Sequence, residues 1–262
     1  MASLVAGCGG TDTSAPASAV KRIRYGELPD QFADLRRPDA DPVGTLVLLH
    51  GGYWMPGYHL DQLDPMAEVM TRAGWATWNV EYRPIGDGSA WPDPMSDVAL
   101  AVDRLEQEGL AEKVVLLGHS AGGHLAVWAA SRTERTPGGR PRVRPVGAIS
   151  LSGVLDLTLA ATAPGSGPPV TAFADGSPAD QPGHYAVSDP TLLVPAVCPV
   201  WAVHAEDDMV IPSEQGASYV DRAVAAGGQA EVVDVPGDHF TLIDPEAPSF
   251  ATIKKLVARA GA

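Results

Sequence analysis

The sequence has few cysteines and no spacing of residues typical of a metal site. Only Cys8 and Cys198 occur in 262 residues. A disulfide between them is not expected, because Cys8 lies in a terminal segment whereas Cys198 leads into a predicted strand. Neither cysteine stands in the Cys/His spacing that zinc sites use. We therefore expect no metal site.

Cations and long apolar runs are also scarce. The chain has 18 lysines and arginines against 32 aspartates and glutamates, for a net charge of −14. Nucleic acid and anionic membranes need clustered cations, so neither is an expected partner. No apolar run approaches the length of a membrane span. The partner that remains is a small-molecule substrate, and the chain as written would be cytoplasmic.

The first residues are low in complexity and permit two interpretations. Leu4-Val5-Ala6-Gly7-Cys8 resembles the cleavage box of bacterial lipoprotein signals, and small residues follow it. The charged start and most of the apolar core of a signal peptide are missing. Either the resemblance is accidental, or the true start lies upstream and Cys8 carries a lipid anchor in the cell envelope. In both cases we expect residues 1–19 to be a disordered tail.

Residues 20–262 are predicted to form one domain of the α/β class. With 45% hydrophobic and 19% charged residues, the composition is that of a globular protein with a full core. Strands are predicted at 20–28, 31–37, 45–49, 75–82, 113–117, 146–152, 199–204 and 231–235. Helical patterns occur at 63–73, 95–107, 125–131, 213–226 and 249–260. This alternation predicts a mostly parallel sheet of about eight strands with helices on both faces. Residues 154–195 have weak periodicity and are predicted to be a short irregular lid.

The most informative stretch is a short apolar run that ends in Gly118-His119-Ser120-Ala121-Gly122, with a helical pattern directly after it. A strand, a sharp turn and a helix with one serine at the apex would hold the Ser120 hydroxyl clear of the sheet. Small neighbours fit this arrangement because the serine backbone is held in a strained conformation. Ser120 is therefore the candidate nucleophile.

A second glycine-rich turn follows the predicted strand at 45–49. The reactive groups of parallel sheets gather at the carboxyl ends of the strands, and His50-Gly51-Gly52-Tyr53-Trp54 lies at such an end. The glycines let the backbone approach a substrate closely. We expect the N–H groups of Gly52 and Tyr53 to join that of Ala121 in stabilising an oxyanion. His50 is expected to support the loop and not to transfer protons.

A serine nucleophile also needs a base and an acid, and each is predicted to follow a late strand. His239 stands in the loop after the last predicted strand, where it can accept the Ser120 proton and return it to a leaving group. After the preceding strand, Glu206, Asp207 and Asp208 compete as the acid that orients the base. Asp208 is preferred for its spacing to the apolar and proline residues that follow, and Asp207 is the main alternative. The order Ser120, Asp208, His239 is typical of the α/β-hydrolase fold.

On these motifs the chain resembles the α/β-hydrolases of the arylformamidase (kynurenine formamidase) and hormone-sensitive-lipase-like branch. The resemblance extends from about Tyr25 to the C-terminus and is strongest in the two stretches at 50–54 and 118–126. It implies hydrolysis of carboxylic esters or small acyl amides without a cofactor. Asp208 and His239 match the remaining triad positions. Formamidase specificity is a weaker implication, because carboxylesterases share the His-Gly-Gly-x-Trp motif.

The sequence thus predicts a serine hydrolase that works through an acyl-enzyme. Trp54, Tyr58 and Trp91 are candidate walls of its substrate pocket. An aminopeptidase-like or thioester hydrolase on the same fold is the alternative within the class. The alternative from another class is a non-catalytic binding protein of this fold, which would have no need of an intact triad.

Overall fold

The central element is an eight-stranded sheet in a computed structural model that describes residues 19–86, 88–163 and 165–262. Its strands are β1 (Lys21–Arg24), β2 (Phe32–Arg36), β3 (Thr45–Leu49), β4 (Ala76–Val80), β5 (Val114–His119), β6 (Gly147–Leu151), β7 (Val200–Ala205) and β8 (Ala230–Val235). Their order is β1-β2-β4-β3-β5-β6-β7-β8. β2 is antiparallel to both β1 and β4, and the strands from β4 to β8 are all parallel. The expectation of a mostly parallel sheet of about eight strands is confirmed.

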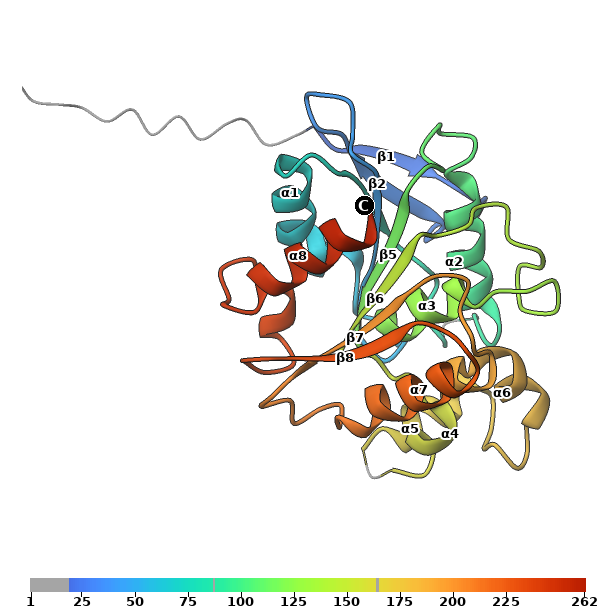
Figure 1. Cartoon of the computed structure of the whole chain (residues 1–262). Helices are drawn as coiled ribbons and strands as arrows, with labels where there is room; N and C mark the ends of the chain where they lie inside the picture. Colours follow the sequence, from blue (N-terminus) through green and yellow to red (C-terminus); the bar gives the residue numbers. More distant parts are fainter. Residues whose placement is uncertain (1–18, 87, 164) are drawn as a thin grey trace, which may run out of the picture.

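Helices cover both faces of this sheet (Figure 1). The principal helices are α1 (Asp64–Arg72), α2 (Asp93–Arg104), α3 (Ala121–Ala130), α7 (Glu214–Ala225) and α8 (Phe250–Ala260). Residues on β3 alternate between the two layers. Leu46 and Leu48 pack in the cluster that contains residues of α1 and α8, whereas Val47 and Leu49 pack with residues of α2, α3 and α7. A strand buried on both faces explains why residues 45–49 are apolar throughout.

The segment 154–195 differs from the expectation of an irregular lid, because half of its residues lie in short helices. It contains α4 (Leu157–Ala160), α5 (Gly167–Phe173), α6 (Pro182–Ser188) and the 3₁₀ turn η2 (Pro190–Leu192). Such short helices show no useful periodicity in sequence, and tertiary contacts stabilise them. The buried Asp189 carboxylate, for example, accepts hydrogen bonds from the backbone and side chain of both Thr158 and Thr191.

This helical segment is fixed to the body of the domain through the end of α6. The His124 Nε2–H donates to the Ser188 carbonyl at 2.9 Å, and the Trp128 indole N–H donates to the Val187 carbonyl at 2.9 Å. The Trp91 indole N–H donates to Ser188 Oγ at 2.9 Å. Two of these donors lie on α3, the helix that follows Ser120. The segment is therefore docked on the helix that begins at the candidate nucleophile.

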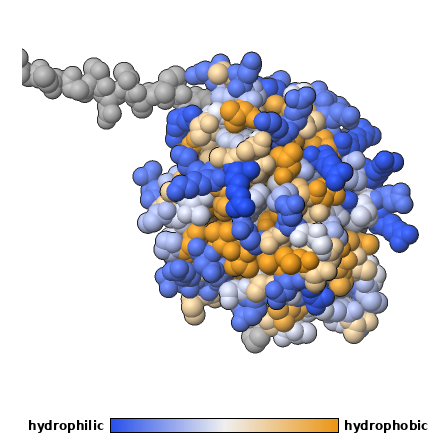
Figure 2. Space-filling model, in the orientation of Figure 1, coloured by the Kyte–Doolittle hydropathy of each residue, from blue (hydrophilic) through white to orange (hydrophobic). Residues whose placement is uncertain are grey.

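The ends of other elements also differ from the sequence expectations. The first strand stops at Arg24, four residues before its predicted end, because the chain turns and the Tyr25 N–H donates to the Gln31 carbonyl at 3.1 Å. Helix α3 begins at Ala121, directly after the serine turn as predicted, and ends at Ala130, one residue before its predicted end. Figure 2 shows hydrophilic and apolar residues interspersed over the face seen in Figure 1. Within the described ranges, no helix has the length and apolarity needed to cross a membrane.

Candidate active site

Ser120 lies between β5 and α3 in a backbone conformation that residues other than glycine rarely adopt. Its φ is 54° and its ψ is −119°. A non-glycine residue with positive φ carries backbone strain, which persists only where the surroundings enforce it. The Ser120 N–H donates to the Leu151 carbonyl of β6 at 2.8 Å, which fixes the turn to the neighbouring strand. The predicted strand, turn and helix are thus present with serine at the apex.

Two glycines allow this turn to pack closely. A Cβ on Gly118 would overlap the Gly122 carbonyl group, and a Cβ on Gly122 would overlap the carbonyl oxygens of Leu49 and His50. The obstacles are backbone atoms, which cannot rotate away as a flexible side chain can. Glycine at both positions is therefore required for α3 to start directly behind the end of β3, beside the second glycine-rich loop.

Asp208 and His239, the candidate acid and base, are in direct contact. His239 Nδ1 lies 2.7 Å from Asp208 Oδ2. The other carboxylate oxygen of Asp208 accepts the backbone N–H groups of Val210 and Ile211, at 2.8 and 2.9 Å. With Nδ1 donating to the carboxylate, His239 Nε2 carries the lone pair that a base needs. Asp207 and Glu206, the alternatives for the acid, are exposed.

These contacts keep the Asp208 carboxyl ionised. Burial raises its pKa, but the hydrogen bond from His239 and the backbone N–H groups of Ile211 and Val210 outweigh burial and lower the pKa to about 2. A carboxylate that accepts several N–H bonds is stabilised in its charged form. Asp208 therefore remains an anion at neutral pH, as the orientation of His239 requires.

His119 has a structural role that the sequence did not indicate. Its Nε2–H donates to the backbone carbonyl of His239 at 2.8 Å, and the two ring centroids are 4.5 Å apart. Burial and the neighbouring His239 ring lower the pKa of His119 to about 3. The neutral His119 ring thus links the residue before Ser120 to the backbone of the candidate base. No local pattern could have shown this, because the two residues are 120 positions apart.

Residues 50–54, which we call the oxyanion loop after the role predicted for them, leave β3 in an unusual backbone conformation. Gly52, Tyr53 and Trp54 have φ values of 110°, 52° and 57°. The Met55 N–H closes the loop by donating to the Gly52 carbonyl at 2.9 Å. Among the described residues, no hydrogen-bond acceptor is found for the N–H groups of Gly52 or Tyr53, and Ala121 is the first residue of α3, whose N–H has no partner within the helix. These three donors are the ones predicted for an oxyanion.

A buried carboxylate supports this loop from behind. Glu81, just after β4, accepts from the Leu60 N–H at 3.1 Å and lies 3.0 Å from His50 Nε2. The second ring nitrogen of His50, Nδ1, lies 2.8 Å from the Gly51 carbonyl oxygen, so both ring nitrogens contact buried oxygen atoms. Burial raises the pKa of Glu81, but its contacts with His50, the Leu60 N–H and His59 together outweigh burial and lower the pKa. The expectation that His50 supports the loop agrees with this geometry.

The predicted pocket walls have different surroundings. Trp54 must be corrected, because it is only 1% exposed and stacks on Phe173 with centroids 4.2 Å apart, so it is a core residue under α5. Trp91 stacks on His184 of α6 at 3.5 Å. Tyr58 is half-exposed and its ring covers Gly52 of the oxyanion loop. Trp54 packs between His124 of α3 and Phe173 of α5. These partners are distant in sequence, so the sequence around Trp54 did not indicate that it is a core residue.

The two cysteines and the other metal-binding residue types add no further site. Within the described ranges, no group of three or more His, Cys, Asp or Glu side chains is arranged to hold a metal ion. The thiol of Cys198 is buried, and burial raises its pKa to about 12. Cys8 lies outside the described residues, so its lipid anchor stays a prediction, as does the disordered tail predicted for residues 1–19, of which 1–18 are not described.

Comparison with known proteins identifies the family. The model of the BD-FAE family matches residues 34–222, which contain Ser120, Asp208 and the oxyanion loop. The chain belongs to the BD-FAE family. A likeness to solved structures supports the same fold: a truncated carbohydrate esterase from gut microbiota has a TM-score of 0.80 and 18% identity, over 94% of this chain and 97% of that one. This member of the BD-FAE family thus has the α/β-hydrolase fold.

Curated relatives of this BD-FAE chain include ester hydrolases and kynurenine formamidases. It is 28% identical over 219 residues to a probable carboxylic ester hydrolase, LipM, of Mycobacterium tuberculosis, across 76% of this chain and 50% of LipM. It is 23% identical over 249 residues to the kynurenine formamidase of Danio rerio, across 90% of this chain and 80% of that enzyme. The chain spans half the length of LipM. The branch expected from the sequence is confirmed.

Proposed function

We propose that this protein is a cofactor-independent serine hydrolase that cleaves a carboxylic ester or a small acyl amide through an acyl-enzyme. The observation that carries the proposal is the 2.7 Å contact between His239 Nδ1 and Asp208, in the same site as a serine held at φ 54°. Such an arrangement costs backbone strain and buries charge, and neither is needed for stability alone. The similarity to esterases and formamidases supports the same conclusion.

In the proposed reaction, Ser120 Oγ attacks the substrate carbonyl and His239 Nε2 accepts the serine proton. Asp208 holds His239 by its Nδ1–H and stabilises the imidazolium that forms. The N–H groups of Gly52, Tyr53 and Ala121 donate to the oxyanion of the tetrahedral intermediate. His239 then gives its proton to the leaving oxygen or nitrogen, and the bond to the leaving group breaks. Water, deprotonated by His239, attacks the acyl-enzyme and releases the carboxylic acid and Ser120.

The choice between ester and formamide substrates rests on the relatives and needs a direct measurement. We would compare kcat/KM on p-nitrophenyl acetate with kcat/KM on N-formyl-kynurenine, with Ser120→Ala as the control. A large preference for the formamide would assign arylformamidase activity, and turnover of the ester alone would assign a carboxylesterase. If Ser120→Ala, shown to be folded by circular dichroism, hydrolyses either substrate like the wild type, the proposed nucleophile is wrong.

A non-catalytic binding protein is the alternative from another class. A fluorophosphonate probe distinguishes the two, because it labels a serine only when a base activates the hydroxyl. We expect labelling of the wild type and its loss in Ser120→Ala. A folded wild type that does not react would support the binding protein. The cytoplasmic location, or an envelope location through Cys8, stays a prediction that cell fractionation tests.

A further inference from the structure

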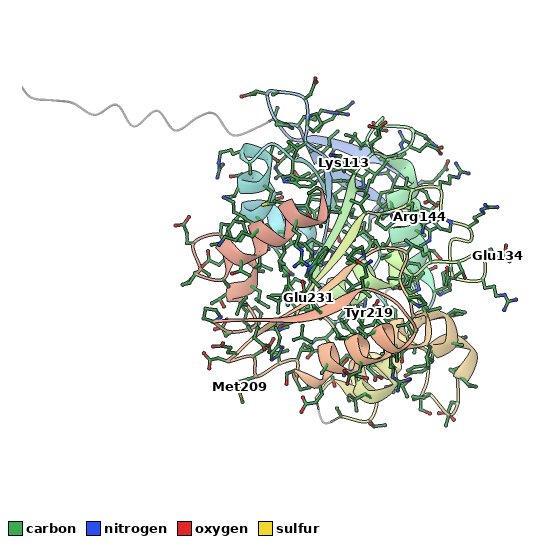
Figure 3. All side chains as sticks on the ribbon, viewed as in Figure 1. Lys113, Glu134, Arg144, Met209, Tyr219 and Glu231 are labelled. Atoms are coloured by element: carbon green, nitrogen blue, oxygen red, sulfur yellow. The ribbon has the colours of Figure 1, made fainter. Side chains whose placement is uncertain are left out.

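A hollow lies far from Ser120, at the end of α3 that is remote from the nucleophile. Its volume is about 450 Å³, and its lining comes from the end of α3, the loop 131–146 and the residue before Cys198. In Figure 3, Arg144 of this hollow and Met209, which follows the candidate acid, lie on opposite sides of the molecule. We call this hollow the arginine groove. Because it is separate from the triad, it is not the substrate pocket proposed above.

The arginine groove concentrates positive charge in an acidic protein. Five of the 18 lysines and arginines lie between residues 132 and 144, where Glu134 is the one acid in the sequence. Arg140, Arg142 and Arg144 are exposed and line the groove. In the described part of the chain, none of the three has a carboxylate within ion-pair distance, although seven other arginines do. Their charge is therefore available to an external anion.

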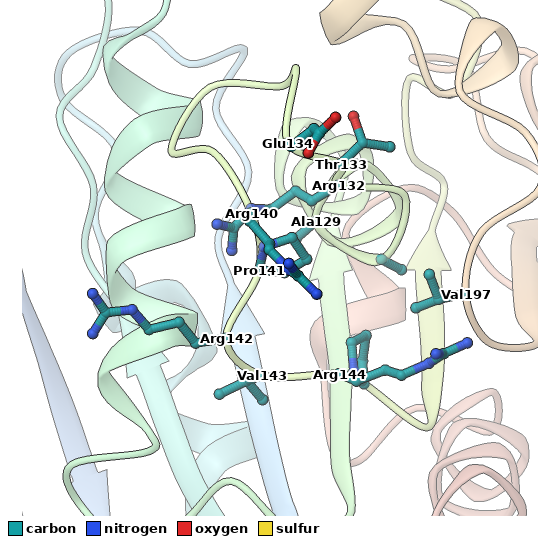
Figure 4. A pocket seen from close by; sticks show the side chains of 12 residues that line it. Ala129, Arg132, Thr133, Glu134, Arg140, Pro141, Arg142, Val143, Arg144 and Val197 are labelled. Carbon is teal, nitrogen blue, oxygen red and sulfur yellow. The ribbon is translucent and has the colours of Figure 1, made fainter.

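The remaining lining of the groove combines the polar residues Arg132, Thr133 and Glu134 with an apolar wall. Ala129 and Val143 are buried beneath it, and Val197 is 40% exposed at its edge. Figure 4 shows Arg142 and Arg144 extending to opposite sides of the hollow, with Val197 on the side of Arg144. A guanidinium beside an apolar wall suits a molecule with one charged group and one apolar body. The volume is in the range of small-ligand sites, which argues for a small molecule and not for a macromolecule.

The loop that carries the arginines is held in place before any ligand binds. Asp103 of α2 accepts the Arg142 backbone N–H at 3.0 Å and the guanidinium of Arg132 at 2.9 and 3.1 Å. The same guanidinium donates to the Gly139 carbonyl at 3.2 Å. On the other side, the Val197 N–H donates to the Ala130 carbonyl at 3.0 Å. A site whose walls are already ordered loses less entropy on binding.

We propose that the arginine groove binds a free organic anion, a small molecule with a carboxylate or phosphate group on an apolar body. The guanidinium groups of Arg140 and Arg144 bind the anionic group, and the apolar body packs against Val143 and Val197. The site is independent of the hydrolase reaction and does not rest on the function proposed for Ser120.

Isothermal titration calorimetry at low ionic strength tests this with phenyl phosphate and benzoate as the organic anions. We expect one site per chain with a Kd of about 1 mM or below for one or both, since two charge-assisted contacts allow this affinity. The stronger of the two identifies the preferred anionic group. Inorganic phosphate should bind several-fold more weakly, and phenol should give no saturable heat. Because the site is separate from the nucleophile, Ser120→Ala should bind as the wild type does.

The variant Arg140→Gln/Arg144→Gln should weaken binding about tenfold or more, because each change removes a charged donor. Arg135→Gln is the matched control: it removes an exposed arginine from the same loop that does not line the groove. All changes are on the surface, so the fold should be retained. The proposal is overturned if neither organic anion binds saturably, if the double variant binds as the wild type does, or if inorganic phosphate binds as tightly as phenyl phosphate.

Discussion

His124 makes the stability of this protein sensitive to mild acid. The ring is fully buried, and its Nε2–H donates to the Ser188 carbonyl at 2.9 Å. Burial lowers the pKa of His124 from 6.5 to about 4. The unfolded chain therefore binds a proton below pH 6.5 that the folded chain does not bind until about pH 4. The contribution of this ring to the free energy of unfolding is fully present above about pH 6.5 and is lost as the pH decreases toward 4.

The size of the effect follows from the two pKa values. Between pH 7 and pH 5, proton uptake by an unfolded histidine of ordinary pKa lowers the free energy of unfolding by about 2 kcal/mol, while the folded ring stays neutral. His119, with its pKa of about 3, should lose a similar amount over the same interval. A variant without the His124 ring should therefore lose unfolding free energy between pH 7 and pH 5 only through its other titrating groups, such as His119.

Urea unfolding at pH 7 and pH 5 measures this. His124→Gln should be destabilised at pH 7, but its further loss on going to pH 5 should be about 2 kcal/mol smaller than that of the wild type. Trp128→Phe is the matched control, because it removes the neighbouring hydrogen bond to the Val187 carbonyl without removing a titrating group. It should be less stable at both pH values, with an unchanged difference between them. If His124→Gln loses as much stability as the wild type between pH 7 and 5, the buried neutral ring is not the cause.

Three further substitutions test the site. Asp208→Asn should lower kcat by about 10⁴-fold without unfolding the protein, because an amide favours the wrong tautomer of the base; steady-state kinetics on p-nitrophenyl acetate measures this, and near-wild-type turnover would refute it. Gly122→Ala should destabilise the protein by several kcal/mol in urea unfolding, since its Cβ meets backbone carbonyls, whereas Gly183→Ala, where a Cβ meets no atom, should not. Glu81→Gln should lower the unfolding free energy by about 1–3 kcal/mol and reduce kcat, because one of the two oxygens that face His50 and the Leu60 N–H becomes an amide donor. Unchanged stability and kcat would show that this carboxylate does not hold the oxyanion loop.

The segment 154–195 shows where sequence periodicity ceases to be informative. Helices of four to seven residues complete too few turns to display a repeating apolar face. They form because distant donors on α3 and in the loop before α2 reach the end of α6, and because Asp189 collects four hydrogen bonds. These contacts join positions that are 64 and 97 residues apart, so no window along the chain contains both partners.

The choice of acid shows a similar limit. Three adjacent carboxylates follow β7, and spacing alone favoured Asp208 while leaving Asp207 open. The structure separates them, because only the Asp208 side chain turns inward to accept two backbone N–H groups and the His239 ring. The support given by His119 and Glu81, and the burial of Trp54, likewise depend on which elements pack together.

What the sequence alone determined is local and periodic. Alternating strands and helices, glycines on both sides of a serine, and acid and base after late strands predicted the α/β-hydrolase fold and the order of the candidate triad, because strand burial and tight turns restrict neighbouring residues directly. Only the tertiary structure decided which acid holds His239, which aromatic residue is core, and that three arginines border a hollow remote from Ser120. These features arise from contacts between segments far apart in the chain, whose geometry is set by packing and not by any short pattern of residues.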